Sequence, residues 1–321
     1  MNDANDWRPT ATRDALVERA ALLARARAFL TERGAFEVET PAISTAAAPD
    51  LHLASLAVPA PDGPRHLHTS PEYALKRLLA AGHGDCFALG KVWRAGESGS
   101  HHQPEFTMLE WYRTGWDHHR LMDEVAALIA ALLAPRHALA APEVVTYRAA
   151  FSAELGIDPL TVPDLGLDAL LAGGGFDSQL DLDRDAKLDL LASHFVYPKL
   201  GQGRVTLLTD FPASQCALAR IRPGDPPVAE RFEAFVAGLE LANGYHELAD
   251  AGEQRRRFEH ANAQRRARGL PEMPLDERLL AAMAEGLPDC AGVALGFDRV
   301  VMLALGARRL DEVIAFPWAR A

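Results

Sequence analysis

Residues 92–112 read VWRAGESGSHHQPEFTMLEWY, and this stretch decides the predicted fold class. In its second half, strict alternation puts Phe106, Glu110 and Tyr112 on one face of an extended strand. The Gly/Ser/His run at 98–102 separates this strand from an apolar one before it, so we expect two antiparallel strands joined by a flexible loop. Several further predicted strands follow one another without crossover helices. This order favours an α+β fold, with an antiparallel sheet flanked by helices, over a doubly wound parallel sheet.

The periodicity of apolar residues predicts the remaining elements. Helices are predicted at 14–33, 71–81, 117–134, 183–196, 253–268, 275–285 and 298–305. Strands are predicted at 36–40, 86–94, 105–115, 205–210, 215–221 and 230–242, and another apolar strand ends at Gly296. The segment from about 136 to 202 is irregular and contains several Pro and Gly residues. We interpret it as a mostly helical insertion in a single domain that spans residues 1–321.

The composition of the chain excludes several classes of protein. Its 321 residues are 49% hydrophobic and 24% charged, which is typical of a folded globular protein. The 33 basic and 44 acidic residues give a net charge of −11, which argues against a broad nucleic-acid-binding surface. No apolar run approaches the roughly 18 residues of a membrane span, and the N-terminus does not resemble a signal peptide. Three scattered cysteines suit a reducing compartment, so we expect a cytoplasmic protein that binds no membrane.

One cluster of polar residues is predicted around the strand that carries Glu110. Glu110 lies beside Tyr112, and a carboxylate next to a phenol suits an ammonium group. The sequence TSPEY at 69–73 begins a predicted helix, in which Ser70 has the position of a cap and Pro71 that of the first turn. Helix capping is a sufficient local explanation of this second motif, so by itself it does not indicate a ligand site.

A second group of carboxylates follows later in the chain. Glu233, Glu240 and Glu247 recur every seven residues in apolar surroundings. On a regular strand an odd offset would put the first two on opposite faces, and we expect a bulge at Gly238 to bring them together. Converging carboxylates suit either a hard cation such as Mg²⁺ or the ammonium group of a substrate.

The stretch 292–306 predicts an apolar strand that turns through Gly296 into a buried helix. Arg299 lies at the start of this helix, and an arginine at such a turn suits a phosphate group. His101 and His102 are adjacent on the expected loop, where neighbouring side chains point to opposite sides. We therefore expect no metal site at this pair.

Together these segments resemble the three signature motifs of class II aminoacyl-tRNA synthetases, in the lysine-type subgroup. The first helix with FEVETP at 36–41 is similar to motif 1, residues 94–112 to motif 2, and residues 292–306 to motif 3. TSPEY and the sequence ELANGYHEL at 240–248 extend the likeness over nearly the whole chain. The resemblance implies a class II catalytic domain that forms a homodimer through motif 1.

Within this subgroup the chain resembles truncated paralogues that modify elongation factor P. Lysyl-tRNA synthetases carry an anticodon-binding domain before motif 1, whereas only about a dozen residues precede the first predicted helix here. We therefore expect no such domain and no tRNA partner. The resemblance implies an enzyme that activates (R)-β-lysine with ATP as an acyl-adenylate and transfers it to the ε-amine of a lysine on elongation factor P.

The resemblance also implies roles for individual residues. Arg94 and Arg299 match the catalytic arginines that hold the phosphates of ATP. The positions that match the amino-acid pocket are Ser70, Pro71, Glu72, Glu110, Tyr112, Asn243, Glu247 and Ala294. The positions that match ATP contacts are Arg94, Ala95, Gly96, Glu97, His102, Gln103, Phe106, Glu240, Leu241, Gly296 and Arg299. Glu233 and Glu240 match the carboxylates that bind Mg²⁺.

Three positions depart from the pattern of lysyl-tRNA synthetases. Gly96 replaces the glutamate of motif 2, and Glu97 is the nearest carboxylate. Gln103 stands where asparagine is usual. Ala294 stands where those synthetases have glycine, and the paralogues that use (R)-β-lysine share the alanine. The methyl group of Ala294 therefore argues for (R)-β-lysine over α-lysine.

Two other functions remain open from the sequence. The chain could activate α-lysine for a different acceptor, which a comparison of the two lysine isomers would separate. It could also be a regulatory subunit without catalysis, but such a protein has no need to keep the phosphate-binding arginines at both Arg94 and Arg299.

Overall fold

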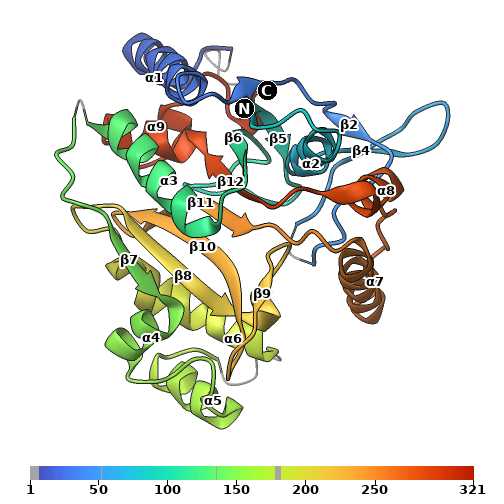
Figure 1. Ribbon diagram of the computed structural model, residues 1–321. Coiled ribbons are helices and arrows are strands. Elements are labelled where there is room, and N and C mark those ends of the chain that lie inside the picture. The colour runs from blue at the N-terminus through green and yellow to red at the C-terminus, as the bar shows by residue number, and fades with distance from the viewer. Residues whose placement is uncertain (1–6, 52, 135, 178–181) are drawn as a thin grey trace. The chain divides into compact units, whose positions relative to one another are not determined.

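The computed structural model describes residues 7–51, 53–134, 136–177 and 182–321 (Figure 1). Residues 178–181, which belong to the predicted insertion, lie outside the described residues, as do residues 1–6. The chain divides into two compact units. The first comprises Met1–Trp116, Ala131–His137 and Ala249–Ala321, and the second comprises Asp117–Ala130 and Ala138–Leu248.

The first unit is built on a four-stranded part of the main sheet. Its elements are α1 (Arg13–Thr31), β1 (Phe36–Glu37), β2 (Ile43–Ser44), β3 (Ala57–Val58), β4 (Arg65–Leu67), α2 (Glu72–Ala80), β5 (Cys86–Trp93), β6 (Glu105–Thr114), α7 (Ala251–Ala267), α8 (Glu277–Gly286), β12 (Cys290–Gly296), α9 (Phe297–Leu305), η4 (Leu310–Glu312) and η5 (Trp318–Arg320). The strand order is β1-β5-β6-β12, and a separate small sheet has the order β2-β4-β3. β1 runs parallel to β5, whereas β5, β6 and β12 are antiparallel to one another.

Local sequence explains where the helices of this unit begin and how they pack. The hydroxyl of Thr12 caps α1 by accepting a hydrogen bond from the Ala15 amide. α9 follows β12 directly and packs against β6, where Trp111 is fully buried. α2 packs against α8, and α8 packs against α7 (Figure 1). The motif 2 strands therefore form the centre of this unit.

The second unit combines five strands of the sheet with a group of short helices. Its elements are α3 (His118–Leu133, whose last residues belong to the first unit), β7 (Glu143–Thr146), α4 (Tyr147–Leu155), α5 (Asp164–Gly173), α6 (Arg184–Leu191), η1 (Ala192–Val196), η2 (Tyr197–Lys199), β8 (Thr206–Pro212), η3 (Ala213–Gln215), β9 (Ile221–Arg222), β10 (Val228–Val236) and β11 (Leu239–His246). The strand order is β11-β10-β8-β7, with β9 beside β10. β7 is parallel to β8, and the other pairs are antiparallel.

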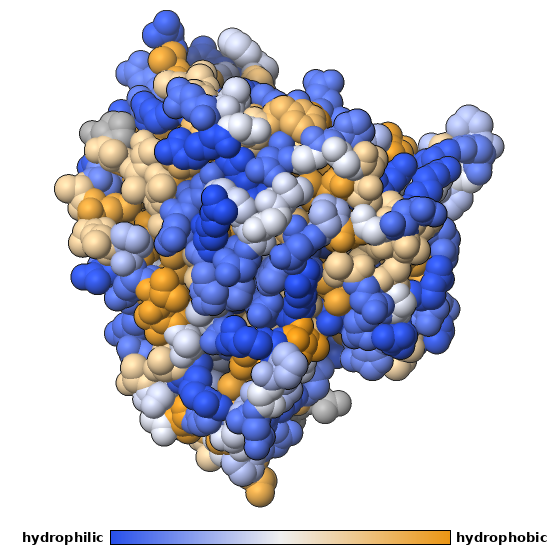
Figure 2. Space-filling view, viewed as in Figure 1, coloured by the Kyte–Doolittle hydropathy of each residue, from blue (hydrophilic) through white to orange (hydrophobic). Residues whose placement is uncertain are grey.

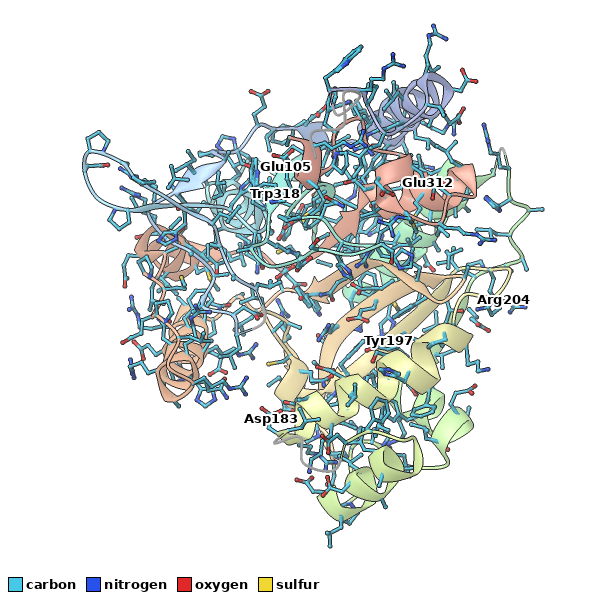
Figure 3. The ribbon with its side chains drawn as sticks, turned by 180° about the vertical axis from the view of Figure 1, so that it is seen from behind. Glu105, Asp183, Tyr197, Arg204, Glu312 and Trp318 are labelled. Carbon is cyan, nitrogen blue, oxygen red and sulfur yellow. The ribbon has the colours of Figure 1, made fainter. Side chains whose placement is uncertain are left out.

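The core of the second unit lies between these strands and the helices from α4 to η2. Tyr147, Phe151 and Phe211 are fully buried in it and form a cluster of aromatic rings. Figure 3 shows the helices in front of the strands, with Tyr197 labelled among them. The Tyr197 ring packs on the ring of Phe235 from β10. One face of β10 is therefore covered by this helical segment.

Most of the predicted elements are confirmed within a few residues, and two are wrong. The mainly antiparallel sheet and its flanking helices agree with the predicted α+β class. However, 230–242 is not one strand but the hairpin of β10 and β11, because Ala237 and Gly238 both adopt positive φ in a tight turn. The segment 215–221 holds the end of η3, an isolated bridge at Ala219 and the first residue of β9, rather than a continuous strand.

The apolar residues form neither a membrane span in the described helices nor a large patch on the face shown in Figure 2. Within the described residues, no helix has the length and hydrophobicity that crossing a membrane requires. On the face shown in Figure 2, hydrophobic residues form small groups between hydrophilic ones.

Candidate active site

One face of the motif 2 strands forms a floor of small residues around a carboxylate. In the strand register, Glu110 lies opposite Ala88 on one side and opposite Ala294 on the other. Tyr112, two residues further along β6, lies opposite Gly292 of β12. Directly opposed residues in antiparallel strands share a face, so small side chains flank the two large polar ones. This arrangement leaves the carboxylate and the phenol as the dominant groups of the face.

The Glu110 carboxylate is the acceptor at the centre of a hydrogen-bond cluster. Its Oε1 accepts from the Tyr112 hydroxyl at 2.9 Å, and its Oε2 accepts from the Ser70 hydroxyl at 2.6 Å. Glu110 is only 2% exposed, so these donors offset part of the cost of burying it. The Ser70 oxygen also accepts from the Glu72 amide at 2.9 Å, which ties the cluster to the start of α2. The structure thus brings together four of the predicted pocket residues, and Pro71 lies between Ser70 and Glu72 in the chain.

Sequence reasoning missed one charged neighbour of this cluster. Lys76 is 1% exposed, and its Nζ lies 2.6 Å from Glu72 Oε1. The pair has i,i+4 spacing on α2, and this spacing of opposite charges is the signal in the sequence that indicates it. Glu72 is therefore already paired with an internal cation, and any ligand ammonium group would share this carboxylate.

Arg94 lies at the end of β5, where the motif 2 loop begins. Its guanidinium carbon is 5.1 Å from the centre of the Phe106 ring, and its Nε donates to the Thr69 carbonyl at 3.4 Å. Glu97 is 3.7 Å from Arg94 NH1, close enough for electrostatic attraction but too far for a hydrogen bond. Gly96 adopts φ +81°, so the residue that replaces the usual glutamate also allows a turn that other side chains disfavour.

Arg299, near the start of α9, contacts the same motif 2 loop. Its NH2 lies 2.6 Å from Nε2 of His102, and its Nε donates to the His101 carbonyl at 3.3 Å. Arg94 thus lies at the base of this loop, and Arg299 contacts its outer part. Both arginines belong to the predicted phosphate site. Gly296 is the N-cap of α9, as the predicted strand-to-helix turn requires.

Gln103 accepts a hydrogen bond from the C-terminal segment rather than from either of these arginines. That oxygen accepts from the backbone amide of Trp318 at 3.0 Å, and Trp318 is labelled in Figure 3. Both residues line a cavity of about 260 Å³ with other residues of the loop and the C-terminal segment. The cavity has no residue of the Glu110 cluster in its lining, so we do not place the substrate there.

In the second unit, the hairpin of β10 and β11 brings Glu233 and Glu240 to one face. The bulge that does so lies at another residue than the predicted one. Ala234 pairs with Ala242, but Phe235 pairs with Glu240, so Leu241 is an extra residue in β11. This bulge places Glu240 on the same face as Glu233, since two residues of β11 oppose one step of β10. The prediction that Gly238 forms the bulge is wrong, because Gly238 belongs to the tight turn.

Arg231 organises the polar face of this hairpin, and sequence reasoning gave it no role. Its NH2 lies 2.5 Å from Glu233 Oε1, and its Nε donates to the Asn243 side-chain oxygen at 3.2 Å. The Asn243 amide in turn donates to the Tyr245 hydroxyl at 2.9 Å. The alternation R-x-E over 231–233 was the signal, since it puts both side chains on one face.

Burial raises the pKa of the Glu233 carboxyl to about 7; the Arg231 guanidinium opposes this rise, and the nearby Glu240 carboxylate adds to it. A buried carboxylate beside a half-buried one favours a further cation, because a positive charge stabilises the ionised form of both. Glu247, which follows β11, is 1% exposed, and its backbone carbonyl accepts from Arg220 at 2.8 Å. Glu233, Glu240, Asn243 and Glu247 thus all belong to the hairpin or follow it directly.

Comparison with known proteins gives a consistent assignment. The family model for class II tRNA synthetases (D, K and N) matches residues 2–320. The chain is 49% identical to the elongation factor P–(R)-β-lysine ligase of Vibrio cholerae, over 99% of both chains. It is 49% and 48% identical to proteins of the same name from Klebsiella pneumoniae and Salmonella gallinarum, over the full length of both. With this coverage and the motif geometry described above, the chain belongs to the class II tRNA synthetase family.

Proposed function

We propose that this chain is an ATP-dependent ligase that attaches (R)-β-lysine to a lysine of elongation factor P. The observation that carries the proposal is the full-length similarity to several relatives that are named for this reaction. The residues that the reaction needs are present at the matching positions, among them two arginines for phosphates and the Glu110 cluster for an ammonium group.

We assign the amino-acid pocket by the resemblance to the family, whose pocket positions are matched by the Glu110 cluster and also by Asn243 and Glu247. Ser70, Glu72 and Tyr112 provide hydroxyl and carboxylate groups, and Glu110 supplies negative charge behind them. Because (R)-β-lysine carries two ammonium groups, a carboxylate-rich pocket selects it by charge-assisted hydrogen bonds.

The first chemical step joins the amino acid to AMP. A carboxylate oxygen of the substrate forms a bond to the α-phosphorus of ATP, and the bond from that phosphorus to the bridging oxygen breaks, which releases pyrophosphate. Arg94 neutralises charge at the α-phosphate and Arg299 at the γ-phosphate. The remaining nucleotide contacts are proposed for Ala95, Gly96, Glu97, His102, Gln103, Phe106, Glu240, Leu241 and Gly296.

Magnesium would be held by Glu233 and Glu240. Burial, and to a smaller extent the Glu240 carboxylate, raise the pKa of Glu233, and a divalent cation would stabilise its charged form. When bound, Mg²⁺ supplies neutralisation of phosphate charge.

The second step transfers the acyl group to the acceptor. The ε-amine nitrogen of a lysine on elongation factor P attacks the acyl carbon, the carbon–oxygen bond to AMP breaks, and the new amide nitrogen loses a proton. An ordinary lysine has a pKa of about 10.4, so the acceptor must lose its first proton before it attacks.

Ala294 is the proposed determinant of the (R)-β-lysine preference. Its methyl group shares a face with Glu110, directly opposite it in the strand register. A group at this position changes the depth of the floor on which the substrate carbon chain lies, so it acts on the placement of the amino group rather than on its charge.

The experiment that tests the function is intact-mass analysis of purified elongation factor P after incubation with the protein, ATP and either lysine isomer. We expect one adduct with (R)-β-lysine and little or none with α-lysine. Pyrophosphate exchange with each isomer, and bulk tRNA as a competing acceptor, complete the set. Equal exchange with α-lysine and no adduct on elongation factor P would instead indicate activation of α-lysine for another acceptor.

We further propose that residues 1–321 form a single catalytic domain with an insertion at about 136–202, and that the protein is a homodimer. One family model spans residues 2–320, which supports the first point. The second is supported by exposed apolar residues in the motif 1 elements, Val17 in α1 and Phe36 in β1.

A further inference from the structure

His118 is a buried imidazole whose polar atoms have no hydrogen-bond partner. It is the first residue of α3 and is only 2% exposed. Neither Nδ1 nor Nε2 forms a hydrogen bond. Burying such a group without a partner costs about 1–3 kcal/mol, so an imidazole at this place needs an explanation that packing alone does not give.

Two further metal-ligating side chains lie beside it. Glu230 from β10 and His246 from β11 are joined by a contact of 2.6 Å between Glu230 Oε2 and His246 Nδ1. The rings of His118 and His246 are stacked, with centroids 6.1 Å apart. One ligand atom from each of the three residues can be chosen so that all lie within 4.8 Å of one another. The three residues are more than a hundred positions apart at the widest, so only the fold assembles them.

This group lies on the face of the hairpin opposite to the proposed magnesium carboxylates. Tyr245 pairs with Arg231 and shares its face, so His246, the next residue of β11, lies on the opposite face, and Glu230 contacts His246 there. The N-terminal part of α3 covers the side of Glu230, and Figure 1 shows it in front of β10 and β11. Within this hairpin, the group is thus on a different face from Glu233 and Glu240.

We propose that His118, Glu230 and His246 form a binding site for a divalent transition metal of the Zn²⁺ class. Two imidazoles and one carboxylate are a ligand set that Zn²⁺ uses with a fourth position left for water. Mg²⁺ and Ca²⁺ prefer oxygen ligands, so a set with two nitrogens disfavours them. A metal bound by these three residues cross-links α3 to the hairpin, and this link does not depend on the proposed reaction.

The surroundings of the three residues suit this role. Glu230 and His246 are partly exposed, which gives an ion a path to them. Arg222 lies 4.0 Å from the other oxygen of Glu230 and can orient that carboxylate.

The test is a Zn²⁺ titration of the full chain after treatment with a chelator. We expect one equivalent of Zn²⁺ to bind by calorimetry in the presence of excess Mg²⁺, and to raise the melting temperature. His118→Leu should weaken this binding at least about 100-fold, because one of three ligands is lost. His119→Leu is the matched control: this neighbour is exposed and outside the group, so Zn²⁺ affinity should stay within threefold of wild type.

A second variant and a second probe keep the outcome decisive. If His118→Leu does not fold by circular dichroism, Glu230→Gln should show the same loss of Zn²⁺ binding. Co²⁺ bound by the wild type should give visible absorption bands of a tetrahedral site, and either variant should lose them. Absence of binding to the wild type, or equal binding by wild type, His118→Leu and Glu230→Gln, would overturn the proposal.

Discussion

The Glu110 carboxylate illustrates how one residue sets the chemistry of a whole face. It is buried and accepts hydrogen bonds from the hydroxyls of Ser70 and Tyr112. Its direct neighbours on the two adjacent strands are the small residues Ala88 and Ala294. A negative charge held in a fixed position, with its donors already in place, is suited to recognising a cation because little reorganisation is needed on binding.

Replacing Glu110 tests this interpretation. Glu110→Gln removes the charge and turns one acceptor atom into a donor, so one of the two hydroxyls loses its partner. We expect kcat/KM for (R)-β-lysine in pyrophosphate exchange to fall about 10- to 100-fold, mainly through KM, as for loss of a hydrogen bond to a charged group. Glu105→Gln, on the same strand but at its exposed start (labelled in Figure 3), is the control and should change little. Unchanged kinetics of Glu110→Gln would contradict the assigned role.

Arg94 is expected to act on the rate of activation itself. Arg94→Ala removes a guanidinium that is positioned at the base of the motif 2 loop, and it should lower the rate of pyrophosphate exchange by about 10²-fold or more. Arg148→Ala provides a matched loss of charge, since Arg148 pairs with Asp158 on the surface of the second unit. A variant at position 94 that exchanges pyrophosphate as fast as the Arg148 variant would rule out the catalytic assignment.

The three cysteines should differ in reactivity with pH. Burial, followed by the charges of Asp85 and Glu110, raises the pKa of the Cys86 thiol to about 11. Only the thiolate reacts, and below its pKa the thiolate fraction rises tenfold per pH unit, so at pH 8 Cys86 is about one part in a thousand thiolate. We expect iodoacetamide at pH 8 to modify half-buried Cys216 well before Cys86, as measured by peptide mass spectrometry. In urea the difference should vanish; equal rates in the folded protein would disprove the expectation.

Among the elements, the β10–β11 hairpin shows how a local irregularity serves a site. The extra residue Leu241 reverses the alternation of β11, so that Glu240 and Asn243 share a face although they are three residues apart. The turn of the hairpin is held from outside, because the amides of Ala237 and Gly238 donate to the carbonyls of Gly201 and Leu200. The positions of the carboxylates that we propose for Mg²⁺ therefore depend on Leu200 and Gly201, which directly follow η2.

Two glycines in the segment that follows η2 allow a controlled comparison of what an added methyl group costs. Gly201 and Gly203 have nearly the same backbone, with φ of +72° and +69°. A Cβ at Gly201 would lie 2.5 Å from the Val236 Cα, whereas a Cβ at Gly203 would meet no atom within 4 Å. Gly203→Ala should cost only the backbone strain of about 1–2 kcal/mol. Gly201→Ala should cost about 1–3 kcal/mol more from the clash.

Urea unfolding followed by circular dichroism gives both free energies of unfolding. Equal losses in the two variants would show that the close approach to Val236 has no energetic weight. Pyrophosphate exchange, measured on the folded fraction of each variant, would then report whether movement of the hairpin turn reaches the chemistry.

At the scale of the whole molecule, the exposed apolar residues of the motif 1 elements support a dimer. Phe36 is 42% exposed on the edge strand β1, and Val17 is exposed on α1. Exposed apolar side chains gain free energy when they are buried, and an interface with a second copy would cover these.

Phe36→Asp should weaken the proposed dimer at least about tenfold, since a charge replaces an apolar side chain of the proposed interface. Light scattering coupled to size-exclusion chromatography, over a range of protein concentrations, measures the change. Leu165→Asp is the control, because Leu165 is 82% exposed on α5, outside the motif 1 elements. A wild-type protein that stays monomeric at every concentration would refute the homodimer.

Much of the fold follows from local pattern. The sequence predicts most of the long helices, because apolar residues with a 3.6-residue period and capping residues can be recognised within a short stretch of the chain. These helices are α1, α2, α3, α7, α8 and α9. The hairpin of β10 and β11 was predicted as a single strand because its turn has only one glycine, and nothing local marks Ala237 as a residue of positive φ. The β2-β4-β3 sheet was not predicted, since strands of two or three residues are too short to show a period.

The sequence by itself determined the order of the main strands and helices, the shared face of Glu110 and Tyr112, and the motifs that place the chain in its family. These are properties of neighbouring residues, which alternation and helical period fix without reference to the rest of the chain. Only the tertiary structure decided that Ser70 bonds to Glu110, that Leu241 brings Glu240 to the face of Glu233, and that His118 meets Glu230 and His246. Each of these depends on strand register or on packing between distant segments, and register is set by long-range pairing rather than by any residue's immediate neighbours.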